Sequence, residues 1–201
     1  GGEGNYGGEE VAAASIVDDV VYMTQLGLMR GHLLVGVRLY ERGAAEAAAT
    51  HMKHPEDELY AALLPAFEAR GVTPMDIELS NLARAVETAQ PIVAVNRAYQ
   101  ILLEAITAAE RVATLTPQQH GEVITELVAT AAEEYTIARA EDGSVANVHE
   151  YQDSFGFAVV AQQLHEKMTM IGGNSDSVAT IGSVLNEIMP IWPDLIPPAR
   201  L

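Results

Sequence analysis

The 201-residue chain contains no cysteine. Disulfide bonds, catalytic thiols, thiolate-based zinc fingers and thiolate-held iron–sulfur clusters are therefore excluded. Basic residues are scarce too: 11 lysines and arginines face 28 aspartates and glutamates, which gives a formal net charge of −17. Because such a chain repels phosphate backbones and anionic lipid surfaces, we expect no nucleic-acid partner.

Long uninterrupted hydrophobic runs are also missing, although 49% of the residues are hydrophobic. The most apolar stretch covers residues 16–41 and would form a helix with almost no polar face, which is typical of a core helix. It is interrupted by Gln25, Arg30, His32 and Arg38. Because a span needs roughly 18 or more apolar residues, we expect no direct membrane span.

The chain lacks the common catalytic signatures. It has no Gly-x-Ser-x-Gly elbow, no glycine-rich phosphate loop, no dinucleotide fingerprint and no His-Glu-x-x-His zincin helix. A di-iron oxidase bundle needs Glu-x-x-His motifs on two helices, whereas this chain has the reverse order, from His54 to Glu58. We therefore expect no enzyme.

Sustained alternation of polar and apolar residues is absent, and the apolar residues instead follow helical spacing. Thr73-Pro74 and Thr116-Pro117 each place a capping hydroxyl before a first-turn proline, which indicates a helix start. We predict an all-α protein, a helical bundle of about six to seven helices. A weak similarity between the segments around Gly43 and Gly143 further suggests two pseudo-symmetric helical hairpins.

The amino-terminal segment is rich in glycine and glutamate and has little to bury. We expect residues 1–12 to form a flexible tether and residues 13–201 to form a single all-helical domain. Because the sequence starts at Gly1 rather than at methionine, we interpret it as a processed, exported protein, either periplasmic or held by a lipid anchor.

The segment from His51 to Glu58 combines two of the six histidines with three carboxylates. On one helix, His51, His54 and Glu58 are spaced i, i+3 and i+7 and project from one face. Imidazole together with carboxylate suits iron, zinc or copper. Pro55 favours a second interpretation, in which His54 only caps a new helix. Both interpretations remain open at this point.

A second constellation places Glu134 before a turn, and His149, Glu150 and Asp153 after it. His149 and Asp153 are i, i+4 neighbours, which can hold a cation or form a local hydrogen bond. His32 is a further candidate, since an imidazole among core residues needs partners for its ring nitrogens. The candidate metal ligands are His51, His54, Glu58, His32, Glu134 and Glu150.

The segment 131–157 contains Glu133-Glu134-Tyr135, the turn Glu141-Asp142-Gly143, and Glu150-Tyr151 ahead of Phe155. In these features it resembles the periplasmic helical region of bacterial Ftr-type iron permeases. The acidic, helical character of the whole chain is similar to that of exported imelysin and EfeO-type iron-uptake proteins, whose Gly-x-His-x-x-Glu motif is absent here. The resemblance implies iron as the ion and an association with transport.

We therefore expect an exported metal-binding protein associated with iron uptake or handling. Iron is the favoured ion, with zinc and copper as alternatives, and the expected partner is a membrane transporter or another envelope protein. A second hypothesis is a non-catalytic helical interaction module, whose histidines serve as caps and core hydrogen-bonders.

Overall fold

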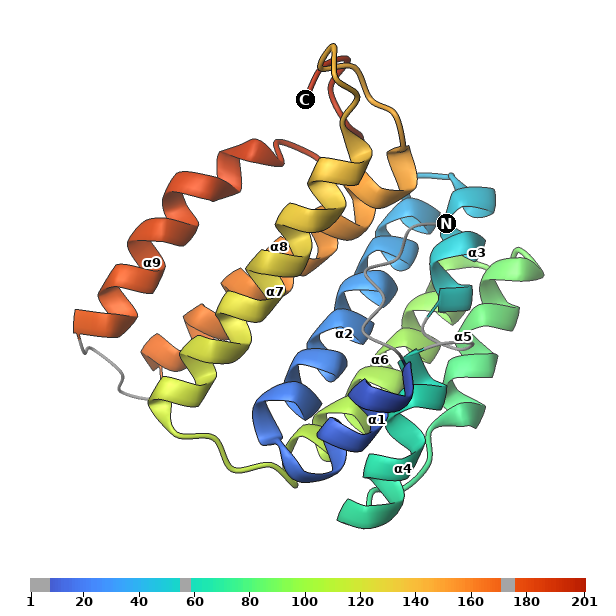
Figure 1. The fold of residues 1–201 in the computed structure, drawn as a ribbon. Helices are drawn as coiled ribbons and strands as arrows, with labels where there is room; N and C mark the ends of the chain where they lie inside the picture. Colours follow the sequence, from blue (N-terminus) through green and yellow to red (C-terminus); the bar gives the residue numbers. More distant parts are fainter. Residues whose placement is uncertain (1–7, 55–58, 171–175) are drawn as a thin grey trace.

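The computed structural model describes residues 8–54, 59–170 and 176–201, and within these ranges it is helical with no strand, which confirms the all-α prediction (Figure 1). The helical elements are α1 (Gly8–Val17), α2 (Asp19–Glu41), α3 (Ala45–His54), α4 (Tyr60–Arg70), α5 (Asp76–Glu87), α6 (Ile92–Glu110), α7 (Pro117–Ala138), α8 (Val148–Met170), α9 (Asp176–Ile188) and the 3-10 helix η2 (Met189–Ile191). The described ranges hold more helices than the expected six to seven because short breaks divide the longer segments.

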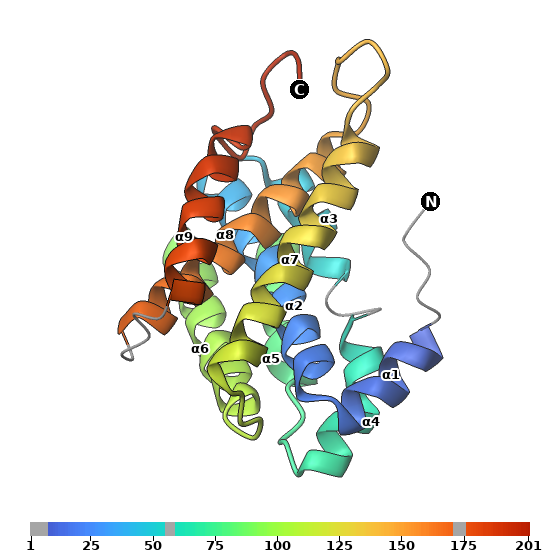
Figure 2. The same ribbon diagram turned by 60° about the vertical axis from the view of Figure 1, so that its left-hand side comes forward.

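Helix α2 is the centre of the bundle, and it packs against α3, α6, α7 and α8 (Figures 1 and 2). The Asp18 side chain accepts hydrogen bonds from the backbone N–H groups of Val20 and Val21 and so caps its first turn. Most residues from Leu26 onward are buried, in agreement with the apolar pattern of residues 16–41. The central position of α2 lets its side chains meet those of several neighbouring helices.

Two helical hairpins pack against each other, and helix α2 belongs to the first of them. Helices α2 and α3 are joined at Gly43, and α7 and α8 are joined by a turn that contains Gly143. Both glycines have φ +81, a left-handed conformation that favours glycine. Helices α2 and α8 then pack against each other. The pseudo-symmetry of the hairpins stays a prediction, but their pairing brings His51 and Asp153 into one region.

Two boundaries differ from the expectation. Helix α1 already begins at Gly8, so residues 8–12 of the expected 1–12 tether are helical. The alanines that follow explain this, since alanine has the highest helix propensity. Helix α5 begins at Asp76 rather than directly at Pro74. By contrast, Thr116 forms a capping box with Gln119 at the start of α7, as the Thr-Pro signal indicates.

The segment after η2 lies beside the α7–α8 turn (Figure 2). Arg200 donates to the carbonyl oxygen of Asp142, and the Leu201 N–H donates to that of Gly143 at 2.9 Å. Trp192 is buried and donates from Nε1 to Ser154 Oγ on α8 at 2.7 Å. These contacts fix the segment against the two helices of the second hairpin.

None of the described helices is by itself long and apolar enough to cross a membrane. The segments Glu10–Val17 and Asp19–Glu41 meet the length and hydropathy criteria only together, across a bend of 117°.

Candidate metal centre

The candidate centre forms where α2 crosses α8 at very short range. A Cβ atom added to Gly156 would lie 2.7 Å from the carbonyl oxygen of Gly31, so only glycine fits at this crossing. Directly beside it, His32 of α2 faces Asp153 of α8, and His32 Nδ1 lies 2.7 Å from Asp153 Oδ1. The small residues thus bring an imidazole and a carboxylate into contact across the two helices.

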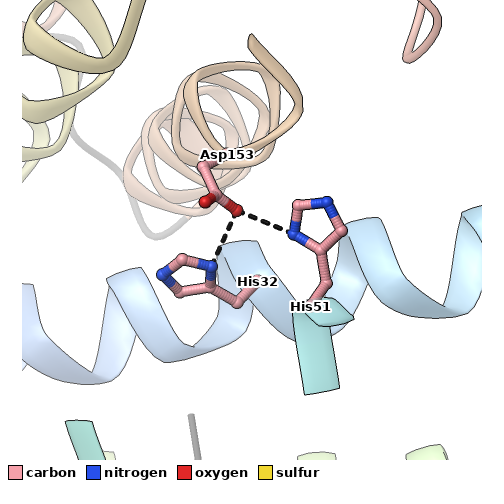
Figure 3. A group of neighbouring side chains, drawn as sticks. All are labelled: His32, His51 and Asp153. Atoms are coloured by element: carbon pink, nitrogen blue, oxygen red, sulfur yellow. Dashed lines mark hydrogen bonds and ion pairs between the residues drawn. The ribbon is translucent and has the colours of Figure 1, made fainter. Parts of the chain in front are cut away.

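Helix α3 contributes the second imidazole. His51 Nδ1 lies 2.9 Å from the same oxygen, Asp153 Oδ1 (Figure 3). Gly36 of α2 faces α3, since a Cβ atom there would lie 2.5 Å from Met52 Cε and 3.4 Å from the Ala48 carbonyl oxygen. His32, His51 and Asp153 are all buried, and one ligand atom of each lies within 4.8 Å of the others. Three helices therefore supply three potential metal ligands to one point.

The charge of Asp153 is maintained by its neighbours. Burial by itself opposes ionisation of this carboxyl, yet the charges of and hydrogen bonds from His32 and His51 hold its pKa well below the usual range. A carboxylate that remains ionised inside a protein attracts a cation, whether a proton shared with an imidazole or a metal ion.

His149 lies on the other side of the carboxylate. Its Nε2 is 3.3 Å from Asp153 Oδ2, which confirms contact between these i, i+4 neighbours. Its ring stacks on that of His51 with centroids 4.0 Å apart and an interplanar angle of 18°. Because imidazole lone pairs lie in the ring plane, two stacked rings do not direct their nitrogens at one ion. In this arrangement His149 contacts Asp153, but its ring nitrogens are not directed at the same point as those of His51.

Glu134 of α7 and Glu150 of α8 pair with each other next to the centre. Burial, the hydrogen bond to Glu150 and the negative charges of Glu150, Asp153 and Glu133 raise the pKa of Glu134 to about 8. Asn147 Nδ2 also donates to Glu150 Oε1 at 3.2 Å. Among the described residues, the group that could hold an ion contains neither glutamate.

The structure thus brings together two of the six candidate ligands, His32 and His51. The His54 side chain and Glu58 lie outside the part of the chain that the structure describes, so the proposed grouping of His51, His54 and Glu58 stays a prediction. Asp153 was not among the candidates, although its i, i+4 spacing from His149 was visible. The sequence feature that could have pointed to Asp153 was Gly156, which lies three residues after it and packs against Gly31.

Comparison with known proteins agrees with the resemblance found in segment 131–157. Residues 110–201, from the last residue of α6 to the end of the chain, match the family model of the iron permease-associated 4-helix bundle domain. No curated protein and no solved structure was found to match the chain. Asp153 lies inside the matched region, whereas His32 and His51 lie before it. Over residues 110–201, this chain is therefore similar to the iron permease-associated four-helix bundle domain.

Proposed function

We propose that this protein is a non-catalytic, metal-binding component of iron uptake or handling, with His32, His51 and Asp153 as ligands. The observation that carries the proposal is the convergence of these three buried side chains, whose ligand atoms all lie within 4.8 Å of one another. The match of residues 110–201 to an iron permease-associated domain supports iron as the ion and a membrane transporter as the partner.

The chemistry of the ligand set suits this role. Two imidazole nitrogens and one carboxylate oxygen are typical ligands of iron, zinc and copper, whereas magnesium and calcium prefer oxygen alone. Asp153 would offset part of the charge of a divalent ion inside the protein. The three ligands come from three helices, so the ion would also hold α2, α3 and α8 together and stabilise the fold.

The rest of the proposal concerns location. An exported protein, periplasmic or lipid-anchored, would meet the ion before the transporter does. The net charge of −17 supports cation capture, since a negative surface raises the local concentration of cations. Protonation of the imidazoles at lower pH would weaken binding and favour release, because a metal needs the unprotonated nitrogen.

Calorimetric titration tests the proposal with Fe²⁺ under anaerobic conditions, Zn²⁺ and Cu²⁺. We expect binding of about one ion per chain in the wild type and its loss in a His32→Ala/His51→Ala variant. His120→Ala is the matched control, because His120 lies on α7 outside the ligand group, and it should bind like the wild type. If no metal binds the wild type more tightly than ~100 µM, the proposal is wrong.

The alternative function is a non-catalytic helical interaction module. One observation favours it: both ring nitrogens of His51 already have partners within the protein, Asp153 and Gln152. A histidine that only satisfies a polar core would be bound in the same way. A thermal melt separates the two hypotheses, since a melting temperature that neither chelator nor added metal changes would favour the interaction module.

A further inference from the structure

Gln152 contacts the one nitrogen of His51 that does not face Asp153. Gln152 Oε1 lies 3.0 Å from His51 Nε2, while His51 Nδ1 lies 2.9 Å from Asp153 Oδ1. Both residues are buried, with 0% of His51 and 4% of Gln152 exposed. Gln152 directly precedes Asp153 on α8, so one turn of this helix contacts both sides of the same ring.

An amide oxygen accepts hydrogen bonds and cannot donate them. The contact with Gln152 Oε1 therefore requires a hydrogen on His51 Nε2. His51 Nδ1 points toward Asp153 Oδ1 and donates to this carboxylate in the metal-free protein (Figure 3). As long as Gln152 keeps its hydrogen bond, a metal ion that binds His51 must therefore take the place of the hydrogen on Nδ1. His32 also presents Nδ1 to Asp153 Oδ1, at 2.7 Å.

We propose that Gln152 is a positioning residue that holds the hydrogen on His51 Nε2 and so reserves Nδ1 for the metal ion. This inference rests on the proposed metal-binding function and assigns the coordinating atom. The ion then binds His51 through Nδ1, next to Asp153 Oδ1. Residues that orient a ligating histidine through its other ring nitrogen typically change metal affinity by about 10–100-fold.

The first test is a two-bond ¹H–¹⁵N correlation spectrum of the metal-free wild-type protein labelled with ¹⁵N-histidine. The expected spectrum shows a protonated Nε2 for His51, whose signals are assigned by their loss in His51→Ala. An Nε2 without hydrogen would mean that the Gln152 amide donates through its NH₂ group and would overturn the inference. This readout needs no metal, so it is informative even if the proposed function fails.

The second test measures Zn²⁺ affinity in two variants at Gln152. Gln152→Glu keeps an acceptor and, when ionised, cannot donate, so at a pH where this carboxylate is ionised we expect affinity equal to or above that of the wild type. Gln152→Leu removes the acceptor, and we expect about 10–100-fold weaker binding. Gln163→Leu, at an exposed position of α8, is the control and should bind normally. Weaker binding by the correctly folded Glu variant, or unchanged binding by the Leu variant, overturns the inference.

The two failures are distinguishable. If the wild type binds no Zn²⁺, Fe²⁺ or Cu²⁺, the proposed function is wrong whatever the spectrum shows. If the wild type binds metal but Nε2 of His51 carries no hydrogen, the function stands and only the role of Gln152 is wrong. If Gln152→Leu shows no cooperative thermal unfolding, this variant is not folded and its affinity is not informative. The spectrum of the wild type and the affinity of the Glu variant then test the inference.

Discussion

Gly156 and Gly31 are in such close contact that a Cβ atom on Gly156 would lie 2.7 Å from the Gly31 carbonyl oxygen. This contact sets the distance between α2 and α8, and with it the distance between His32 and Asp153. The glycine pair therefore determines whether the candidate centre can form, although neither glycine has a side chain to offer it.

The first prediction concerns this crossing. Gly156→Ala should force the two helices apart and lower the free energy of unfolding by about 1–3 kcal/mol, the usual cost of overpacking. Metal affinity should fall as well, because His32 and Asp153 separate. Urea denaturation and calorimetric titration measure both effects.

Gly121→Ala is the matched control for that variant. A Cβ atom at Gly121 of α7 meets only the end of a flexible side chain, Ile181 Cδ1 at 3.1 Å. Since alanine favours helix by about 1 kcal/mol over glycine, this variant should be as stable as the wild type or more stable. Equal effects of the two substitutions would show that the crossing is not tightly packed.

The second prediction concerns the shared carboxylate. Asp153→Asn keeps the shape of the side chain but removes the charge that attracts a cation. Metal at about 100 times its dissociation constant should raise the melting temperature of the wild type by roughly 5–10 °C, and that of the variant hardly at all. Glu166→Gln, at an exposed position of the same helix, should keep the full shift. An equal shift in Asp153→Asn would remove this residue from the ligand set.

The third prediction concerns pH. The pKa of Glu134 rises from 4.5 to about 8 in the folded protein, chiefly because of burial and then because of its hydrogen bond to Glu150. The folded state therefore binds this proton more tightly than the unfolded state does. The resulting stability is fully present below about pH 4.5 and is lost as the pH rises through about 8.

Urea denaturation of the metal-free protein between pH 5 and pH 9 measures this effect. Glu134→Gln stays neutral at every pH, so its free energy of unfolding should fall less with rising pH than that of the wild type. Glu126→Gln, at an exposed position of the same helix whose charge does not act on Glu134, should retain the wild-type slope. Parallel curves for the wild type and Glu134→Gln would contradict the assignment.

The fourth prediction concerns the carboxy-terminal segment. Trp192→Phe removes the donor to Ser154 Oγ, which in turn donates to the carbonyl oxygen of Ala131 on α7. The loss of this buried hydrogen bond should cost about 1 kcal/mol of unfolding free energy. A double-mutant cycle with Ser154→Ala separates the hydrogen bond from the packing of the ring. Strictly additive effects would show that the bond contributes nothing.

Much of the fold follows from local signals. Thr116-Pro117 marks the start of α7, Pro91 precedes α6, and Gly43 ends the first long helix, because each residue type acts on the backbone within a turn or two. The extra helices, and the helical start at Gly8, were missed. Short breaks between helices depend on tertiary packing as well as on local propensity.

For a related reason, the sequence predicts only some of the residues of the candidate centre. His32 and His51 are recognisable in the sequence as candidate metal ligands, but helical spacing does not indicate which helices pack against each other. Asp153 looks like a solvated carboxylate until α8 is placed against α2. Gly31 indicates a close neighbour, and only the structure identifies Gly156 as the partner. Long-range pairing of this kind is absent from any local window of the sequence.

The most direct test of the central claim is X-ray absorption spectroscopy of the Zn²⁺-loaded wild-type protein. We predict a first shell of nitrogen and oxygen at ~2.0–2.2 Å, with outer-shell scattering from two imidazoles that disappears in His32→Ala/His51→Ala. A shell without imidazole scattering would place the ion on carboxylates, such as Glu134 and Glu150, and would contradict a centre built from His32, His51 and Asp153.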